Sequence, residues 1–244
     1  MSDSKKITGV KMSEGEGAKV NRLFPNENYK GHHDPFVLMD EFSVEAPAEF
    51  PEHEHRGFEA ITYMLEGSFI HEDNLGNKAE VKQGGIQAFN AGKSIIHSEK
   101  PGSEKYSHGI QLWVNLPEEK KHSEPAYYQL EKTKFIKKTE NVQIKEILGE
   151  NTSINLNNEL KYLDIDIKND QEFSYSLDQN KTGILYLITG GLEEGEENIK
   201  PGEGLLLSKG ANFKVKIVEN KAHFLIITGK PHNQPIIING SFVE

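Results

Sequence analysis

The sequence predicts an all-β fold of two similar β-barrels in tandem, and three observations support this prediction. Many short apolar runs have the length of β-strands, turns rich in glycine and proline separate them, and the two halves of the chain share a faint repeat. Helical periodicity is nearly absent, and only residues 117–121 favour a short turn of helix. The chain of 244 residues is long enough for two domains of about 120 residues.

The apolar runs have the composition of strands as well as the length. They are rich in Ile, Val, Tyr and Phe, which favour a pleated and partly buried backbone. Short segments that contain glycine, such as Glu66-Gly67 and Gly190-Gly191, mark the turns between them. The expected strands are residues 36–39, 60–65, 68–71, 86–89, 109–116, 162–167, 183–188, 204–207, 213–218 and 223–228.

The repeat divides the chain into two expected domains. Tyr-Met-Leu-Glu-Gly at residues 63–67 is similar to Tyr-Leu-Ile-Thr-Gly at residues 186–190, and both lie in a strand followed by a hairpin. We therefore expect one barrel over residues 1–130 and a second over residues 131–244. The alternative is that unrelated β-hairpins share this pattern by chance.

Composition excludes several classes of function. With 28 Lys and Arg against 38 Asp and Glu, the net charge of −10 gives no general attraction to nucleic acid, so no direct nucleic-acid partner is expected. The absence of cysteine excludes disulfides and thiolate ligands. The N-terminal residues lack the apolar core of a secretion signal, and no run approaches the roughly 18 apolar residues of a membrane span. We expect a cytoplasmic protein without membrane association.

Two pairs of side chains carry the expected chemistry. Because side chains alternate faces along a strand, His53 and His55 point to one side, and so do His97 and Glu99. Two such strands that face each other across a barrel would bring together three imidazoles and one carboxylate. The alternative is a solvated strand face, which is the common explanation of a lone pair of alternating histidines.

This set of side chains suits one divalent first-row metal ion and leaves coordination positions open. Fe(II) fits well, while Zn, Mn, Ni, Cu and Co would also bind to the same ligand types. The repeat places Ser176, Asp178, Val215 and Ile217 at the corresponding positions of the second half. These residues provide no ligand set, so we expect a single site in the first barrel and a barrel without metal in the second.

Three segments of the first half resemble the pirin family of cupin proteins. They are Asp-Pro-Phe-Val-Leu-Met-Asp-Glu-Phe at residues 34–42, His-Glu-His-Arg-Gly-Phe-Glu at residues 53–59 with Leu-Glu-Gly at residues 65–67, and His-Gly-Ile-Gln-Leu-Trp-Val-Asn-Leu-Pro at residues 108–117. The resemblance covers nearly all of residues 7–130 and is weaker near residues 229–231 and 240–243. It implies a bicupin of two jelly-roll barrels with a metal, typically iron, in the N-terminal barrel.

The resemblance also implies which residues bind the metal. The ligands of the family correspond to His53, His55, His97 and Glu99, whereas Glu59 occupies the position that is a ligand in other cupins. Asn-Ala-Gly at residues 90–92 replaces the usual Pro-x-Gly of the second cupin motif, as is common in pirins.

Several family members are similar to quercetin 2,3-dioxygenases, which open the flavonol ring with O2 and release carbon monoxide. We therefore expect an oxidoreductase that acts on a small planar aromatic substrate and O2, with Glu99 as a catalytic residue that binds the metal or takes the proton of the substrate hydroxyl. The alternative is a metal- or redox-sensing regulatory protein that binds a transcription factor or a metabolic enzyme, because animal pirins act as iron-dependent coregulators.

Further side chains lie close to these motifs in the sequence. We expect Arg56 and Glu59 to pair with each other or with a loop and so hold the ligands in position, the alternative being a surface ion pair of little weight. Large aromatic residues are candidates for the wall of a substrate pocket, with core packing as the alternative: Phe50, Phe58, Phe89 and Trp113.

Overall fold

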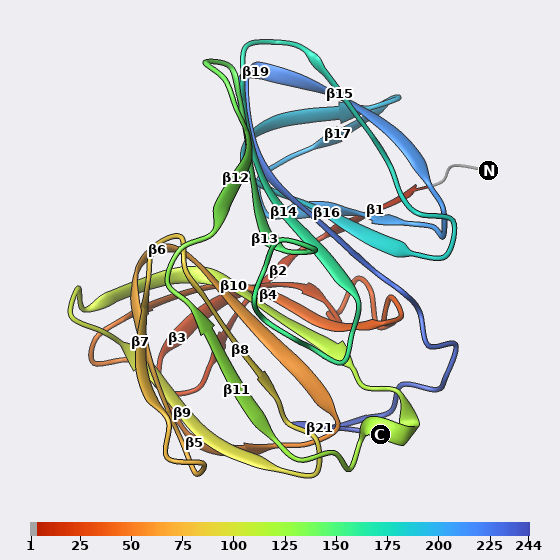
Figure 1. Ribbon diagram of the computed structural model, residues 1–244. Coiled ribbons are helices and arrows are strands. Elements are labelled where there is room, and N and C mark those ends of the chain that lie inside the picture. Colours follow the sequence, from red (N-terminus) through yellow and green to blue (C-terminus); the bar gives the residue numbers. More distant parts are fainter. Residues whose placement is uncertain (1–3) are drawn as a thin grey trace. The chain divides into compact units, whose positions relative to one another are not determined.

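The computed structural model describes residues 4–244 and consists almost entirely of β-strands (Figure 1). The expected helical turn is present as the short 3-10 helix η1 (Glu118–Lys120). No helix within residues 4–244 is long and apolar enough to cross a membrane. The strands form two compact units, each with its own sheet, so the predicted all-β, two-barrel class is confirmed. Residues 1–3 of the expected first domain lie outside the described residues.

The first barrel comprises Val10–Thr133, Ser153–Asn158 and His232–Glu244. Its main sheet has the order β11-β8-β6-β10-β4-β3-β2, and β5, β7 and β9 attach through pairing with one another or with β6. The strands of this unit are β2 (Val10–Glu14), β3 (Ala18–Phe24), β4 (Phe36–Glu45), β5 (Phe50–His55), β6 (Phe58–Asp73), β7 (Lys78–Lys82), β8 (Ile86–Asn90), β9 (Ile95–Pro101), β10 (Tyr106–Asn115), β11 (Ala126–Leu130), β20 (Ile238–Asn239) and β21 (Phe242–Val243).

The long strand β6 connects the two groups of strands in this barrel. Its first part pairs with β8 and its second part pairs with β7 and β9. Gly67 lies at the change of partner with φ of +73°, where a Cβ atom would come within 2.0 Å of the Tyr106 carbonyl oxygen. Only glycine fits there, and the bend that it permits closes the sheet into a barrel.

The second barrel comprises residues 4–9, Lys134–Thr152 and Glu159–Pro231. Its sheet has the order β1-β18-β16-β19-β14-β13-β12, with β15 on β19 and β17 on β16. Its interior is filled by aliphatic residues and by Phe213 and Phe224. The strands are β1 (Ser4–Thr8), β12 (Lys134–Lys138), β13 (Val142–Leu148), β14 (Leu160–Lys168), β15 (Glu172–Ser176), β16 (Thr182–Glu194), β17 (Glu197–Ile199), β18 (Glu203–Leu207) and β19 (Asn212–Gly229).

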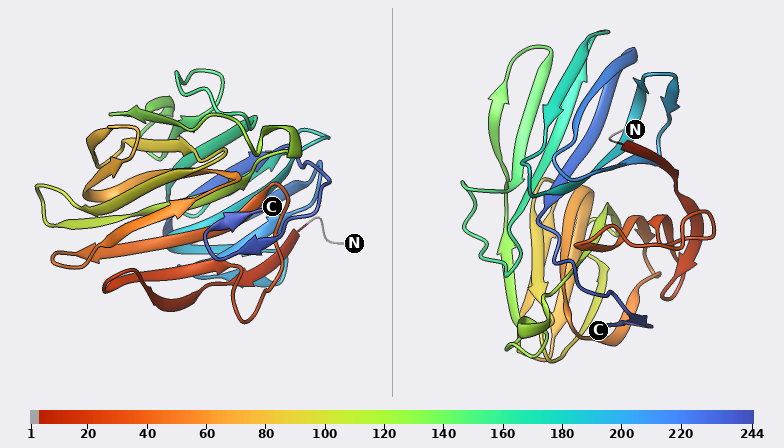
Figure 2. Two further views of the ribbon diagram at one scale, coloured as in Figure 1. Left: turned by 90° about the horizontal axis from the view of Figure 1, so that it is seen from below. Right: turned by 90° about the vertical axis from the view of Figure 1, so that its right-hand side faces the viewer.

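The units exchange segments, and they therefore differ from the expected division at residues 130 and 131 in three places. Strand β1 pairs with β18 and belongs to the second barrel, whereas residues 153–158 and 232–244 belong to the first. Figure 2 shows the red N-terminal strand among strands coloured as the second half, and the dark blue C-terminal segment beside strands of the first half. An edge strand that offers free backbone groups accepts a partner from any part of the chain, so these exchanges have no local signal.

The C-terminal segment is tied to the turn that follows β5. The Val243 backbone N–H donates to the Arg56 carbonyl over 3.0 Å, and Val243 is buried in a core cluster with Phe58 and Phe89. The Lys121 ammonium donates to the Gly57 and Val243 carbonyl oxygens. The last residues of the chain are thus part of the first barrel.

Glu59 anchors the inserted residues 153–158. It lies in β6 with no exposed surface. Its Oε1 accepts the backbone and side-chain N–H groups of Asn157 over 2.6 and 3.0 Å, and its Oε2 accepts those of Asn158 over 3.1 and 2.8 Å. A buried carboxylate with four donors is well satisfied, and its removal leaves those donors without an acceptor.

We predict that Glu59→Ala lowers the free energy of unfolding of the first barrel by about 3 kcal/mol, because buried amide groups lose a charged acceptor. Urea denaturation followed by the fluorescence of Trp113, the single tryptophan of the chain, measures this change. The exposed Glu131 provides the control, and Glu131→Ala should change the free energy by less than about 0.5 kcal/mol. Equal small losses in both variants would contradict the anchoring role.

Candidate metal centre

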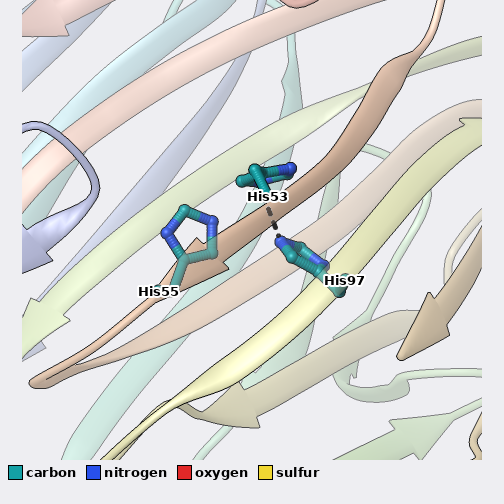
Figure 3. A group of neighbouring side chains, drawn as sticks. All are labelled: His53, His55 and His97. Carbon is teal, nitrogen blue, oxygen red and sulfur yellow. Dashed lines mark hydrogen bonds between the residues drawn. The ribbon is translucent and has the colours of Figure 1, made fainter. Parts of the chain in front are cut away.

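Strands β5 and β9 bring three histidines together. The two strands pair antiparallel with His53 opposite His97, and His55 follows two residues after His53 on the same strand. The ring centroids lie 4.4 Å apart for His53 and His97, 4.5 Å for His53 and His55, and 5.0 Å for His55 and His97. Figure 3 shows the three rings grouped between the two strands. One nitrogen of each ring lies within 4.8 Å of the others.

The Nδ1 atom of each ring already has a partner within the protein. His53 Nδ1 lies 2.7 Å from the Pro51 carbonyl oxygen, and His55 Nδ1 lies 3.2 Å from the Ser241 carbonyl oxygen. A carbonyl oxygen only accepts, so both Nδ1 atoms carry the proton and both Nε2 atoms carry a lone pair. His97 Nδ1 lies 3.2 Å from His71 Nδ1.

The Nε2 atoms of His53 and His97 face each other. His53 Nε2 and His97 Nε2 lie only 3.1 Å apart (Figure 3). Two nitrogens bound to one metal ion at about 2.1 Å and near right angles are separated by roughly 3.0 Å. The observed separation therefore fits two ligands of one ion, and the neutral imidazoles are the ligand type that such an ion prefers.

Burial disfavours protonation of the clustered histidines, which is the alternative to binding a metal ion. It lowers the pKa of His53, and together with the neighbouring His53 it lowers the pKa of His55 to about 3. It also lowers the pKa of His97 well below the usual value. The cluster is therefore a set of neutral donors at neutral pH, which favours a metal cation over a proton.

Glu99 belongs to a second group that shares His97 with the first. Ligand atoms of His71, His97 and Glu99 also lie within 4.8 Å of one another, and all three residues are buried. The Gln87 amide donates to Glu99 Oε1 over 2.5 Å. Burial raises the pKa of Glu99 to about 8, against the opposing effect of this hydrogen bond. The carboxyl group thus holds its proton near neutral pH unless a cation displaces it.

His71 is a further buried histidine beside the cluster and does not belong to either of the two predicted ligand pairs. It lies in β6 opposite Glu99 of β9 and has no exposed surface. The alternation of His71 and Asp73 repeats the spacing of the two ligand pairs, and this signal could have identified it. Within residues 4–244, both groups of three potential metal ligands lie in the first barrel, whereas Val215 and Ile217 are buried in the core of the second.

A cavity of about 510 Å³ adjoins the histidine cluster. His53, His55 and Glu99 lie in its wall, and Arg22, Asp40 and Gln111 add polar groups. Its aromatic lining consists of Phe42, Phe50, Phe69 and Trp113. The C-terminal segment contributes Ile238, Gly240 and Ser241. The candidate ligands therefore face a largely apolar cavity that includes four large aromatic rings.

The other expected site residues divide between the cavity and the core. Phe50 and Trp113 line the cavity, whereas Phe58 and Phe89 pack in a core cluster around Ile95 and so are not part of its wall. Core packing, the alternative given for these aromatic residues, thus describes Phe58 and Phe89, because the sequence does not distinguish a core face from a cavity face when both are apolar.

Of the two partners expected for Glu59, a loop and Arg56, the structure shows the loop. Arg56 is half exposed and donates to Glu54 Oε1 over 2.8 and 2.6 Å, while its guanidinium lies 4.8 Å from the centroid of the Phe242 ring. Strand alternation explains why Arg56 pairs with Glu54, because side chains two residues apart on a strand point to the same side. Glu59 lies on the next strand and binds a loop instead, as described above.

Two cupin barrels with a histidine cluster in the first define a bicupin. A family profile described as Pirin matches residues 17–114, and one described as Pirin C-terminal cupin domain matches residues 162–244. Pirin of Homo sapiens is 35% identical over 258 residues, which cover 100% of this chain and 89% of that protein. Pirin-1 of Arabidopsis thaliana is 35% identical over 252 residues, covering 98% and 86%. The chain therefore belongs to the pirin family.

Solved structures share the fold. A crystal structure of quercetin 2,3-dioxygenase from Acinetobacter baumannii has a TM-score of 0.87 at 24% identity and covers 98% of this chain and 90% of that chain. The bacterial pirin YhhW from Escherichia coli, in complex with nickel(II), has a TM-score of 0.75 at 20% identity and covers 93% and 99%. These similarities confirm the predicted bicupin architecture.

Proposed function

We propose that this protein is a metal-dependent dioxygenase of the quercetin 2,3-dioxygenase type, which cleaves a flavonol-like substrate with O2. In this proposal His53, His55, His97 and Glu99 hold the metal ion. The observation that carries the proposal is the convergence of imidazole Nε2 atoms beside a cavity, with the Nδ1 atom of each ring engaged elsewhere. Proteins described as quercetin 2,3-dioxygenase and as a nickel(II)-bound pirin share the fold.

The proposed ion is Fe(II), and the same donors also suit Zn, Mn, Ni, Cu and Co. A bound divalent ion supplies positive charge and open coordination positions, which is the chemistry that O2 and a chelating enolate need. We assign Glu99 as the carboxylate ligand because it follows His97 on the same strand face. Gln87 holds Glu99 Oε1, so Oε2 is the oxygen we assign to the ion.

The cavity determines the class of substrate that we propose. Its volume of about 510 Å³ lies within the range of roughly 300–1,000 Å³ that is typical of small-molecule sites. The rings of Phe50, Phe69 and Trp113 offer apolar faces to a flat aromatic molecule. The ion pair of Arg22 with Asp40, with N–O distances of 2.9 and 2.8 Å, adds a polar group to the same wall. These walls would orient the substrate and exclude water.

Glu99 is also the residue that we propose to handle the substrate proton. Its carboxyl group lies in the cavity wall with His53 and His55, where a hydroxyl group of a bound flavonol would come within its reach. The Nδ1 atoms of the three histidines have partners within the protein and their Nε2 atoms are assigned to the metal ion, which leaves Glu99 as the proton acceptor of this group.

Anaerobic loading with Fe(II), addition of quercetin and then exposure to O2 test the proposed reaction. We expect a change in the quercetin spectrum before O2 is added, and afterwards one carbon monoxide released for each O2 consumed. Binding of quercetin without turnover in air would overturn the enzymatic proposal. The regulatory alternative would instead require a protein partner that is retained by the oxidised metal form and not by the reduced form.

We predict that His55→Ala lowers the affinity for Ni(II) by about 100-fold or more and abolishes quercetin turnover, because it removes one of three converging donors. Competition with a chelator measures the affinity. His122 is an exposed histidine of the same barrel, and His122→Ala is the matched control that should leave both quantities unchanged. Similar losses in both variants would contradict the assigned ligand.

We also predict a defined dependence of metal affinity on pH. Below pH 8 the metal-free protein carries a proton on Glu99 that the ion must displace, whereas the buried histidines are already neutral near pH 7. The affinity should therefore rise about tenfold per pH unit between pH 6 and 8, with one proton released per ion, and level off above pH 8.

Calorimetry in buffers of different ionisation enthalpy counts the released protons. Glu99→Gln should remove the slope, and His122→Ala should keep it. A release of two or three protons near pH 7 would show that the histidines are protonated and would contradict this account.

A further inference from the structure

Asp73 is held in place at the end of β6 by several hydrogen bonds. Its side chain has no exposed surface. Oδ1 accepts the backbone N–H groups of Leu75 and Asn77 over 2.9 and 3.0 Å, and Oδ2 accepts the Asn77 amide and His71 Nε2, each over 2.9 Å. Burial alone opposes ionisation, but the hydrogen bonds from His71 and Asn77 hold the pKa of Asp73 below its usual value. The carboxylate is thus an acceptor for every group around it.

His71 connects this carboxylate to the histidine cluster. Its Nε2 faces Asp73, its Nδ1 lies 3.2 Å from His97 Nδ1, and its ring stacks on Tyr127 with centroids 4.5 Å apart. In the contact between His71 Nδ1 and His97 Nδ1, one nitrogen donates and the other accepts. Both ring nitrogens are therefore committed to partners in the protein.

The positions of the protons follow from these contacts. An ionised carboxylate only accepts, so His71 Nε2 carries the proton that it donates to Asp73. A neutral imidazole has one proton, and His71 Nδ1 is therefore an acceptor. It receives the proton of His97 Nδ1, and His97 Nε2 is left with a lone pair on the side of His53.

We infer that Asp73 and His71 form a two-step hydrogen-bond chain that fixes the tautomer and orientation of His97 and thereby presents its Nε2 to the metal ion. The two residues are positioning residues, and the metal-binding part of this inference rests on the proposed function. His71 does not share an ion with His53, because the two nitrogens of His97 point in different directions and His71 meets the one opposite to His53.

The pairing of β6 with β9 makes this chain rigid. Asp73 lies opposite His97 in the register, so the carboxylate and the ligand that it influences are on neighbouring strands. Asn74 adds two bonds to β9, one from its backbone N–H to the Ile96 carbonyl over 2.9 Å and one from the Ile96 N–H to its side-chain oxygen over 3.1 Å. The hairpin that follows β6 is therefore fastened to the ligand strand itself.

The variant Asp73→Asn should reverse the direction of donation along the hydrogen-bond chain, and the side chain at position 73 keeps nearly the same size. The backbone N–H groups of Leu75 and Asn77 require an acceptor, so the amide oxygen takes the place of Oδ1 and the NH2 group faces His71 Nε2. His71 Nε2 then accepts, its Nδ1 donates to His97 Nδ1, and the proton of His97 moves to Nε2. A protonated Nε2 cannot bind a metal ion.

The experiment compares the wild type with Asp73→Asn and with Glu72→Gln. Glu72 precedes Asp73 on the same strand, faces the exposed Lys78, and its substitution removes the same charge. NMR of the metal-free full chain with 15N-labelled histidine identifies which nitrogen of His97 is protonated, and chelator competition measures the affinity for Ni(II).

We expect His97 to be protonated at Nδ1 in the wild type and in Glu72→Gln, and at Nε2 in Asp73→Asn. The affinity for Ni(II) should fall between about 10- and 100-fold in Asp73→Asn alone. An unchanged His97 tautomer together with an unchanged affinity in Asp73→Asn would overturn the inference.

A second variant keeps the test decisive if Asp73→Asn does not fold. His71→Phe keeps a ring against Tyr127 but offers no acceptor to His97, so it should populate both tautomers of His97 and weaken Ni(II) binding about tenfold or more. An unchanged affinity for Ni(II) and a His97 protonated only at Nδ1 in His71→Phe would refute the proposed hydrogen-bond chain. The NMR measurement needs no metal, so the two proposals can fail separately. A wild type that has the expected His97 tautomer but does not bind Ni(II) would refute the proposed function and still support the hydrogen-bond chain.

Discussion

The candidate metal site of the first barrel depends on one constraint. The Nδ1 atoms of His53, His55 and His97 each contact a partner that lies away from the centre of the histidine cluster. An imidazole with a proton on Nδ1 has its lone pair on Nε2, and the Nε2 atoms of His53 and His97 meet at 3.1 Å. Without this commitment, rings so close together would exchange protons with one another. With it, the buried neutral rings face a point that a cation fills far better than a proton does.

The three partners come from different parts of the chain, which relates the exchanged segments to the site. Pro51 lies on the same strand as His53, and Ser241 lies in the C-terminal segment that packs on the first barrel. The third partner, His71, is held by a carboxylate in the hairpin after β6. The return of residues 232–244 to the first barrel therefore supplies both a wall of the cavity and an acceptor for His55.

Sequence reasoning succeeded where the signal is local. Alternation along a strand is sufficient to place His53 with His55 and His97 with Glu99, and turns rich in glycine are sufficient to separate the strands. It failed where a residue chooses a distant partner. The bond from His55 to Ser241 spans 186 positions, and the strand β1 joins β18 across the whole chain. No local pattern specifies such contacts, because an edge strand or a buried hydrogen-bond donor can be paired with a group from any part of the chain.

The same limit explains the errors near the ligands. Glu59 is close to Arg56 in sequence, yet the strand turns at Gly57, where a φ of +78° and a Cβ position 1.9 Å from the Val243 carbonyl oxygen require glycine. After this turn Glu59 faces Asn157 and Asn158, which are about a hundred positions away. His71 and Asp73 alternate in the same way as the two predicted ligand pairs, but no sequence pattern indicates that their strand pairs with β9.

Anomalous diffraction from crystals of the Fe(II)-loaded protein, measured at the iron edge, locates the metal ion and its ligands. We predict one peak per chain, at about 2.1 Å from the Nε2 atoms of His53, His55 and His97, with Glu99 as a fourth ligand. A peak coordinated through Nδ1 atoms, a peak centred on His71, or no peak in the first barrel would contradict this prediction.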